Sequence, residues 1–428
     1  MDIAALYSLF KKHPSVQTDT RKLQAGDLFF ALKGPSFNGN QFALQALEAG
    51  AAYAIIDEAP AMPNNRLILI NDVLSTLQQL AGYHRSQFNI PFIAITGSNG
   101  KTTTKELVHA VLNAHFTTST TQGNLNNHIG IPLTLLRVPA NAQMAVVEMG
   151  ANHQKEIEGY CAYTRPTHGI ITNAGKAHLE GFGGVEGVKK GKGELFDFLR
   201  ANDGTAFAFD DYDYLHKMSQ GIQEIVWYGT EKGNITGSVL ASEPFLQVAI
   251  HQGASFASLQ TQLVGDYNLP NVLCAITIGK YFGVPDDAIK QAIENYKPGN
   301  SRSQLVEKGT NSIILDAYNA NPSSMRAAIQ NFAALQAPSK VLLLGAMMEL
   351  GPESQQEHQA LANLLQQYSW KQVVLVGGDF KNVTSPYLYL EDALQAREWL
   401  QQQHFEHTHI LVKGSRSTGM ERVLAEQL

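Results

Sequence analysis

Short apolar runs alternate with amphipathic stretches along most of this chain, and most of the runs end in glycine or a polar residue. Runs of this length separated by helical periodicity are typical of parallel strands buried in an α/β sheet. A helix is expected over 41–49, where Gly50 ends it, and short β-structure forming a meander is expected over 221–262. The predicted strands cover 27–32, 52–56, 93–96, 145–149, 169–173, 312–316, 340–345, 372–377 and 409–414.

Two junctions divide the 428 residues into three regions. Asn89-Ile90-Pro91 ends a helical stretch directly before a strand, and Lys297-Pro298-Gly299-Asn300 separates two helix-and-strand series. A chain of this length exceeds a single ordinary core. We therefore expect a small mixed α/β N-terminal domain, a central phosphate-loop ATPase-like domain with a parallel sheet, and a C-terminal Rossmann-like, doubly wound domain. Their expected ranges are 1–88, 89–297 and 298–428.

Composition and charge exclude several classes of protein. The apolar fraction of 44% and the charged fraction of 16% are typical of a globular protein with large buried sheets. A net charge of -6 argues against non-specific binding to nucleic acid, which needs basic patches. The N-terminal residues lack a signal-peptide pattern, no apolar run is long enough to cross a membrane, and Cys161 and Cys274 have no metal-binding spacing. We expect a cytoplasmic protein without membrane insertion, and a monomer.

A glycine-bracketed turn follows the strand at 93–96 and precedes an amphipathic helix, which is the order of a phosphate-binding loop. The backbone N–H groups of such a turn face phosphate oxygens, Lys101 supplies a point charge, and the Thr102 hydroxyl suits Mg²⁺. Ile95 occupies the position of the usual first glycine, so the loop is a shortened variant. The alternative is a chance glycine-rich turn, which the flanking strand and helix disfavour. The predicted nucleoside triphosphate contacts are Gly97, Ser98, Asn99, Gly100, Lys101, Thr102 and Thr103.

Polar residues at other strand ends are candidates for metal and phosphate chemistry. Glu148 ends a buried strand and is a natural magnesium ligand, although it could instead cap the next helix. His178 follows another strand end, and the pattern supports a metal ligand and an ordinary surface or core histidine about equally. Lys192 lies in a lysine- and glycine-rich segment that suits a solvated turn, a phosphate contact, or a carbamate formed with CO₂ that would bind metal.

The third region adds candidates of its own. Arg302 follows the second junction, where an arginine can reach a γ-phosphate when domains close. Asp316 and Asn319 end a predicted strand, where they suit contacts to a ribose and a base, and the competing interpretation is an ordinary Asn-Pro turn.

Taken in order, these segments resemble the Mur ligase family of ATP-dependent enzymes that build peptidoglycan, and the resemblance covers essentially the whole chain. It is carried by 96–102, Val147 to His153, Asn173 to Gly183, Asp316 to Pro322 and Lys413 to Ser417, the last followed by Met420-Glu421. The resemblance implies that Lys101 and the loop amides bind ATP, and that Thr102 and Glu148 hold one Mg²⁺. It also implies that His178 holds a second Mg²⁺, supported by Lys192 as a carbamate, and that Asn271, Arg302, Asp316 and Asn319 approach the nucleotide.

The motifs also imply the branch of the family that adds D-alanyl-D-alanine to UDP-N-acetylmuramoyl-tripeptide, with the C-terminal domain closing over ATP and binding the dipeptide. Lys101, Glu148, His178 and Lys192 are then the catalytic candidates. Two features depart from the family pattern. Ala346 stands where many relatives carry aspartate, so no chemistry is assigned to 345–351, and Pro298 to Arg302 differs from the compact proline-glycine-arginine form. The implied substrate contacts are Thr20, Arg21, Asn38, Gly39, Asn124, Asn126, Asn127, Lys413, Ser415 and Arg416.

The implied reaction has two steps. ATP phosphorylates the terminal carboxylate of the tripeptide, and the amine of the dipeptide then displaces phosphate. The alternatives are a sibling ligase that adds diaminopimelate or lysine, a folylpolyglutamate synthase, or an ATP-binding protein without catalysis. The Asp316 to Pro322 motif argues against the siblings. The sequence leaves open whether the tripeptide carries diaminopimelate or lysine, whether Lys192 is carbamylated, the oligomeric state and the degree of domain closure.

Overall fold

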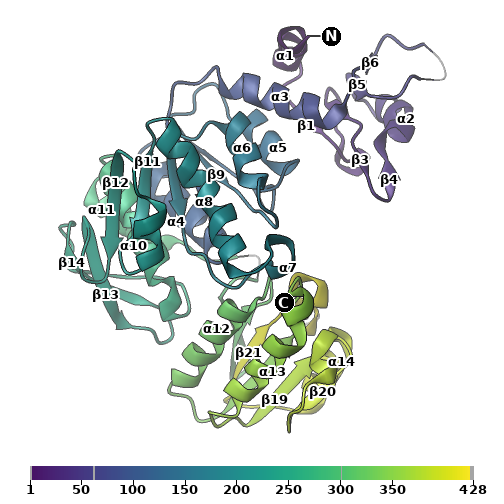
Figure 1. The fold of residues 1–428 in the computed structure, drawn as a ribbon. Coiled ribbons are helices and arrows are strands. Elements are labelled where there is room, and N and C mark those ends of the chain that lie inside the picture. The colour runs from purple at the N-terminus through teal and green to yellow at the C-terminus, as the bar shows by residue number, and fades with distance from the viewer. Residues whose placement is uncertain (1, 61–62, 300, 425–428) are drawn as a thin grey trace.

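The computed structural model describes residues 2–60, 63–299 and 301–424. It contains three lobes, each built on its own sheet, and the N-terminal and C-terminal lobes both adjoin the central one (Figure 1). The strands of the three main sheets come from 16–69, 92–260 and 304–413. The expected junctions near residues 88 and 297 fall between these ranges, and the three-domain α/β fold is confirmed.

The N-terminal lobe has a small parallel sheet of order β1-β2-β5-β6 and a separate hairpin formed by β3 and β4. The predicted strand at 27–32 is shorter than expected, and the predicted helix at 41–49 is divided between a 3₁₀ turn over 39–42 and α2. The elements are α1 (Ile3–Lys12), β1 (Val16–Gln17), β2 (Leu28–Phe30), β3 (Lys33–Gly34), β4 (Phe37–Asn38), α2 (Ala43–Glu48), β5 (Tyr53–Ile56), β6 (Leu67–Leu69) and α3 (Val73–Arg85).

The central lobe has a nine-stranded sheet of order β15-β14-β13-β12-β11-β10-β7-β9-β8, parallel from β13 to β8. Every residue of β7, β9 and β11 is buried, so both faces of the sheet are covered. The expected meander is present, since β13, β14 and β15 pair antiparallel. The strands are β7 (Phe92–Thr96), β8 (Thr118–Thr120), β9 (Met144–Glu148), β10 (His168–Ile171), β11 (Thr205–Phe209), β12 (Glu224–Gly229), β13 (Ile235–Ala241), β14 (Gln247–Gln252) and β15 (Ser258–Gln260).

Helices cover this sheet, with α4 packing on α10 and α6 packing on α8. The helix α3 leaves the N-terminal lobe and packs on α5 and α6, so it joins the two lobes (Figure 1). The helices are α4 (Lys101–Asn113), α5 (Gly130–Leu136), α6 (Glu156–Thr164), α7 (Leu179–Phe182), α8 (Val185–Ala201), α9 (Asp213–Met218), α10 (Leu269–Tyr281) and α11 (Asp286–Asn295).

The C-terminal lobe has a sheet of order β16-β17-β21-β18-β19-β20, parallel except for the edge pair β16 and β17. Alternate residues of its strands fall in two separate apolar clusters, one with α12 and α13 and the other with α14, which confirms the doubly wound arrangement. All four predicted strands of this region are present, and β16 and β20 are additional. The elements are β16 (Gln304–Lys308), β17 (Asn311–Asp316), α12 (Pro322–Ala334), β18 (Lys340–Gly345), α13 (Ser354–Leu365), β19 (Gln372–Val376), β20 (Leu388–Leu390), α14 (Ala393–Gln402) and β21 (His409–Lys413).

One partly buried histidine makes the stability of the central lobe depend on pH. His168, at the start of β10, is surrounded by the rings of Phe207, Tyr281 and Phe282, and burial lowers its pKa to about 4. The unfolded chain, with a histidine pKa near 6.5, therefore binds the proton more readily than the folded chain between these two values. We expect acidification from pH 7 to pH 5 to remove about 2 kcal/mol of stability through this residue. Thermal melting of the wild type and of His168→Phe at both pH values checks this, because equal losses in the two proteins would exclude His168 as the source.

Candidate functional site

The turn between β7 and α4 has the geometry of a phosphate loop, and its two glycines are needed for it. Gly97 and Gly100 have φ of 144° and 79°, which lie in the positive-φ region that residues with a Cβ atom rarely adopt. A Cβ on Gly97 would lie 2.0 Å from Thr172 Oγ1, so no larger residue fits there. The backbone amides of the loop and the N-terminus of α4 thus lie together, which is an arrangement suited to anionic phosphate.

The segment that follows β10 holds this loop in place. Thr172 Oγ1 donates to the Asn99 carbonyl at 2.6 Å, and the Asn99 N–H donates to Asn173 Oδ1 at 2.9 Å. Ser98 Oγ donates to the Gly175 carbonyl at 3.0 Å. The side chains of Thr172 and Asn173 therefore hold the loop from the segment after β10, and Ser98 of the loop bonds back to the same segment, so the loop amides are ordered before any ligand arrives.

Lys101, at the start of α4, has its ammonium inside the loop. Its Nζ donates to the carbonyls of Gly97 and Ser98 at 2.7 and 3.2 Å. Burial lowers the pKa of Lys101 to about 8, while the charge of Glu148 raises it and that of Arg302 lowers it. A triphosphate at the loop would offer this ammonium stronger, charged partners than two carbonyls.

Glu148 ends β9, beside β7 in the sheet, and its carboxylate is 1% exposed. Its Oε1 accepts a hydrogen bond from Asn126 Nδ2 at 2.6 Å, and its Oε2 is buried without a hydrogen-bond partner among the described residues. A buried carboxylate oxygen without a partner is unfavourable unless a cation binds it. The donor set of Glu148 and Thr102 therefore fits a magnesium ion, and the alternative of a helix-capping glutamate is not what the structure has.

These residues line a cleft of about 720 Å³ between the central and C-terminal lobes. Neither Gly97 nor Lys192 lines the cleft, but Gly97 contributes the carbonyl that holds Lys101. Of the expected site residues, the cleft brings together Ser98, Asn99, Gly100, Lys101, Thr102, Thr103, Asn126, Asn127, Glu148, His178, Asn271, Arg302, Asp316, Asn319 and Lys413.

The site residues contributed by the C-terminal lobe are hydrogen-bonded to one another. Lys413 Nζ lies 2.5 Å from Asp316 Oδ2 and 3.3 Å from the Asn319 carbonyl. Asp316 Oδ1 accepts from the Ser303 N–H at 3.2 Å. The Lys413 ammonium is thus paired inside the lobe, and its contact with substrate stays a prediction.

Contacts between the lobes involve four residues that the sequence analysis did not assign to the site, namely Lys176, Asn321, Glu349 and Glu357. His178 Nδ1 contacts the Glu349 carboxylate, although no chemistry was expected at 345–351. Asn321 Nδ2 donates to Asn99 Oδ1 in the phosphate loop at 2.7 Å, and Lys176 pairs with Glu357 of α13. A histidine held through one ring nitrogen by a carboxylate presents its other nitrogen in a fixed direction, as metal ligands do.

Lys192, on α8, is 1% exposed and donates to the Ala151 carbonyl at 2.9 Å. Burial and, to a lesser degree, the charge of Lys101 hold its pKa well below the usual value. The neutral amine is the form that adds CO₂, so this environment fits carbamate formation. The described residues contain no group of three His, Cys, Asp or Glu side chains positioned to hold a metal ion.

Asn271 faces the phosphate loop from α10. Its Oδ1 accepts from Thr104 Oγ1 at 3.0 Å, and its Nδ2 donates to Asn268 Oδ1 at 2.9 Å. A Cβ on Gly100 would lie 2.7 Å from the same Oδ1, so this asparagine and the loop glycine are closely packed. Asn271 therefore lines the cleft with its side chain held in one orientation.

Other expected substrate residues lie outside this cleft. Asn124 and Arg416 line an adjoining cavity of about 320 Å³, which shares Thr102, Arg302 and Tyr318 with the cleft. The Ser415 hydroxyl lies 3.3 Å from that of Ser417.

The residues expected to bind the uridine nucleotide belong to the N-terminal lobe. Arg21 is exposed and pairs with Asp19, and Thr20 begins the same short turn. The Asn38 amide donates to the Glu58 carboxylate at 3.0 Å, and a Cβ on the adjacent Gly39 would lie 2.4 Å from the Leu32 carbonyl. The structure therefore does not bring these four residues to the phosphate loop, and they stay predictions.

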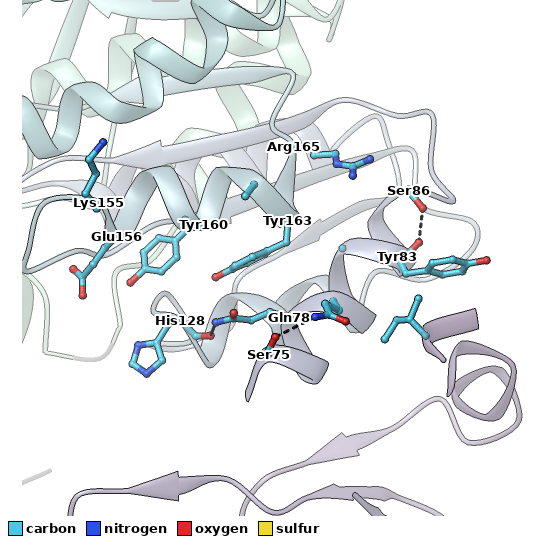
Figure 2. Close-up of a pocket in the computed structure, with 15 residues that line it drawn as sticks. Ser75, Gln78, Tyr83, Ser86, His128, Lys155, Glu156, Tyr160, Tyr163 and Arg165 are labelled. Carbon is cyan, nitrogen blue, oxygen red and sulfur yellow. Dashed lines mark hydrogen bonds between the residues drawn. The ribbon is translucent and has the colours of Figure 1, made fainter. Parts of the chain in front are cut away.

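A second large cavity, of about 700 Å³, lies between α3 and α6 (Figure 2). It shares His128, Glu156 and Tyr160 with the cleft, while Tyr83, Tyr163 and Arg165 line its far part. Sequence reasoning missed this cavity, because it forms only where helices from two lobes meet. It also missed the tyrosines of the cleft, Tyr160, Tyr212, Tyr214, Tyr267 and Tyr318. The one available signal was the position of Tyr318 directly after a strand end.

Comparison with known proteins gives the same assignment along the whole chain. The Mur ligase family catalytic domain matches residues 14–85, the Mur ligase middle domain matches 95–279, and the Mur ligase glutamate ligase domain matches 301–416. A relative from Escherichia coli, named UDP-N-acetylmuramoyl-tripeptide–D-alanyl-D-alanine ligase, is 36% identical over 96% of this chain and 92% of its own length. The chain belongs to the Mur ligase family.

Solved structures of Mur ligases agree with this. MurF from Acinetobacter baumannii has a TM-score of 0.87 at 30% identity, covering 96% of this chain and 92% of that one. MurF ligase from Thermotoga maritima in complex with ADP has a TM-score of 0.86 at 25% identity, covering 96% of both chains. The expected family and fold are thus confirmed.

Proposed function

We propose that this chain is the ATP-dependent ligase that adds D-alanyl-D-alanine to UDP-N-acetylmuramoyl-tripeptide, releasing ADP and phosphate and giving the pentapeptide precursor of peptidoglycan. The observation that carries the proposal is the similarity, over 96% of the chain, to ligases named for this reaction. The cleft supplies what such chemistry needs, namely a preformed phosphate loop, a buried lysine and a carboxylate oxygen without a hydrogen-bond partner in the described part of the chain.

In the first step, the terminal carboxylate of the tripeptide attacks the γ-phosphorus of ATP, forming a C–O–P acyl phosphate and breaking the bond to ADP. Lys101 and the loop amides would bind the β and γ phosphates and offset the repulsion between two anions. Thr102 and Glu148 would hold a magnesium ion, which supplies Lewis-acid stabilisation of the transferring phosphoryl group. Asn271, Asp316 and Asn319 would contact the nucleoside.

In the second step, the free amine of D-alanyl-D-alanine attacks the acyl carbon, and the tetrahedral intermediate expels phosphate as the peptide bond forms. The acyl phosphate is easily hydrolysed, so water must be excluded while the amine arrives. The pairs Asn99–Asn321, His178–Glu349 and Lys176–Glu357 connect the two lobes across the cleft. We propose that they hold the closed arrangement.

His178 and Lys192 would serve a second magnesium ion, Lys192 after its neutral amine adds CO₂ and loses a proton to give the anionic carbamate. The burial of Lys192 supports this proposal. Intact-protein mass spectrometry after bicarbonate treatment and mild trapping of the carbamate tests it. The proposal would be contradicted if the wild type lacked the mass of the trapped carbamate while a protein known to carry a lysine carbamate showed it under the same treatment.

The donor would bind with its uridine nucleotide at Thr20, Arg21, Asn38 and Gly39 and its muramoyl-peptide along Asn124, Asn126 and Asn127. The acceptor side would be bound by Lys413, Ser415 and Arg416. We further propose a monomeric, cytoplasmic enzyme that binds no nucleic acid. Among the described residues, no helix has the length and apolar character to cross a membrane.

Phosphate release from ATP in the presence of the UDP-muramoyl-tripeptide tests the function when candidate acceptors are added singly. We expect release and a new peptide bond with D-alanyl-D-alanine and neither with single amino acids. Release with diaminopimelate, lysine or glutamate instead would assign the chain to a sibling reaction. Absence of release with every acceptor would favour a protein that binds ATP without catalysis.

A further inference from the structure

Tyr318 lies where the cleft meets the adjoining cavity, and its side chain lines both. It follows β17 by two residues, between Asp316 and Asn319. Two arginines from distant segments contact it, one after the second junction of the chain and one after β21. Its ring and its hydroxyl make different contacts, so the two parts of the side chain can be considered separately.

The ring holds Arg302. The Arg302 guanidinium carbon lies 3.6 Å from the centroid of the Tyr318 ring, which is a close cation–π contact. Arg302 Nε is buried and has no hydrogen-bond partner in the described part of the chain. The stacking contact is therefore a main determinant of where this guanidinium points. Arg302 lines the same cleft as the phosphate-loop residues Ser98 to Thr103.

The hydroxyl holds Arg416. Arg416 Nη1 donates to Tyr318 Oη at 3.4 Å, and its guanidinium carbon lies 5.4 Å from the ring centroid. Arg416 faces the adjoining cavity, together with Asn124 and Glu421. An arginine in such a cavity is suited to a carboxylate, and the acceptor dipeptide carries one.

We propose that Tyr318 is a positioning residue whose ring directs Arg302 toward the triphosphate and whose hydroxyl directs Arg416 toward the carboxylate of the acceptor dipeptide. The proposal rests on the proposed function for the identity of both ligands. It predicts that the effect on ATP binding and the effect on dipeptide binding can be separated by removing different parts of the side chain. Removal of the hydroxyl alone should affect the dipeptide, whereas removal of the aromatic face should affect both ligands.

The test compares Tyr318→Phe and Tyr318→Leu with the wild type, with Tyr389→Leu on β20 as a control in the same lobe. Calorimetric titration with ATP and Mg²⁺ gives nucleotide affinity without turnover, and steady-state rates give KM for the dipeptide. We expect Tyr318→Leu to weaken ATP binding about tenfold, as loss of a desolvated cation–π contact does. Tyr318→Phe should bind ATP within about twofold of wild type and raise KM for the dipeptide about threefold, with kcat nearly unchanged.

A double-mutant cycle separates positioning from a general structural effect. In an Arg302→Ala background, Tyr318→Leu should weaken ATP binding no further, because the group that it positions is already absent. A Tyr318→Leu protein that binds ATP like wild type, or one whose loss persists fully without Arg302, would overturn the role of the ring. An unchanged dipeptide KM in Tyr318→Phe would overturn the role of the hydroxyl. A wild type that binds ATP but ligates nothing would refute the proposed function and the acceptor role, while the ATP titrations would still decide the role of the ring.

Discussion

Replacement of Lys101 by alanine is expected to reduce ligation by roughly a thousandfold, as removal of a central charge from a phosphoryl-transfer site does. The ammonium is buried within the phosphate loop, and its Nζ lies 2.7 Å from the Gly97 carbonyl, where it would meet the β and γ phosphates. Phosphate release under saturating donor and dipeptide measures the loss. The surface lysine Lys217, exposed on α9, provides a matched control, and Lys217→Ala should retain wild-type activity.

The Lys101→Ala protein should keep its fold, because the loop is held by Thr172, Asn173 and Ser98 rather than by this side chain. Its melting temperature should stay close to that of the wild type. Ligation at more than a tenth of the wild-type rate in a folded Lys101→Ala protein would contradict the phosphate-loop assignment.

Glu148→Gln is expected to lower kcat by about a hundredfold to a thousandfold and to raise the Mg²⁺ concentration needed for half-maximal rate. The substitution keeps the size of the side chain and removes the charge that would bind the ion. Since Oε2 of Glu148 is buried without a partner among the described residues, the same change should leave the melting temperature of the ligand-free protein unchanged or raise it. Mg²⁺ titrations of the rate and calorimetric melting measure the two effects.

Loss of activity together with a gain or no change in stability is typical of a functional carboxylate, because a structural one stabilises the fold. Asn126→Ala is the matched control, since it removes the 2.6 Å hydrogen bond to Oε1 but leaves the charge of Glu148. We expect its Mg²⁺ requirement to change much less. A Glu148→Gln protein that is markedly destabilised and has an unchanged Mg²⁺ requirement would show that Glu148 is structural.

The parts of the site that could be predicted from the sequence are those fixed by neighbouring residues. The loop from Gly97 to Thr103 is contiguous, and its glycines, lysine and flanking strand identify it without knowledge of the fold. Glu148 could be predicted from a general property of parallel sheets, whose carboxyl ends lie along the same edge. Most strands were found for a similar reason, because strands buried on both faces are continuous apolar runs.

The contacts between lobes could not be predicted, because they join residues far apart in the chain. His178 and Glu349 are 171 positions apart, and Asn99 and Asn321 are 222 apart. The pairing of Lys413 with Asp316 likewise depends on β21 lying beside β17, an order that local sequence does not specify. The short strands β1, β8 and β20 were missed because two or three residues carry too little periodicity.

The most direct test of the account follows oxygen from the donor to the released phosphate. The terminal carboxylate of the UDP-muramoyl-tripeptide is labelled with ¹⁸O and incubated with the protein, ATP, Mg²⁺ and D-alanyl-D-alanine, and mass spectrometry measures the label in phosphate. The account predicts one ¹⁸O atom in each phosphate for every peptide bond formed, because the carboxylate oxygen leaves with the phosphoryl group of the acyl phosphate. Peptide bond formation with unlabelled phosphate, or with release of pyrophosphate and AMP, would contradict it.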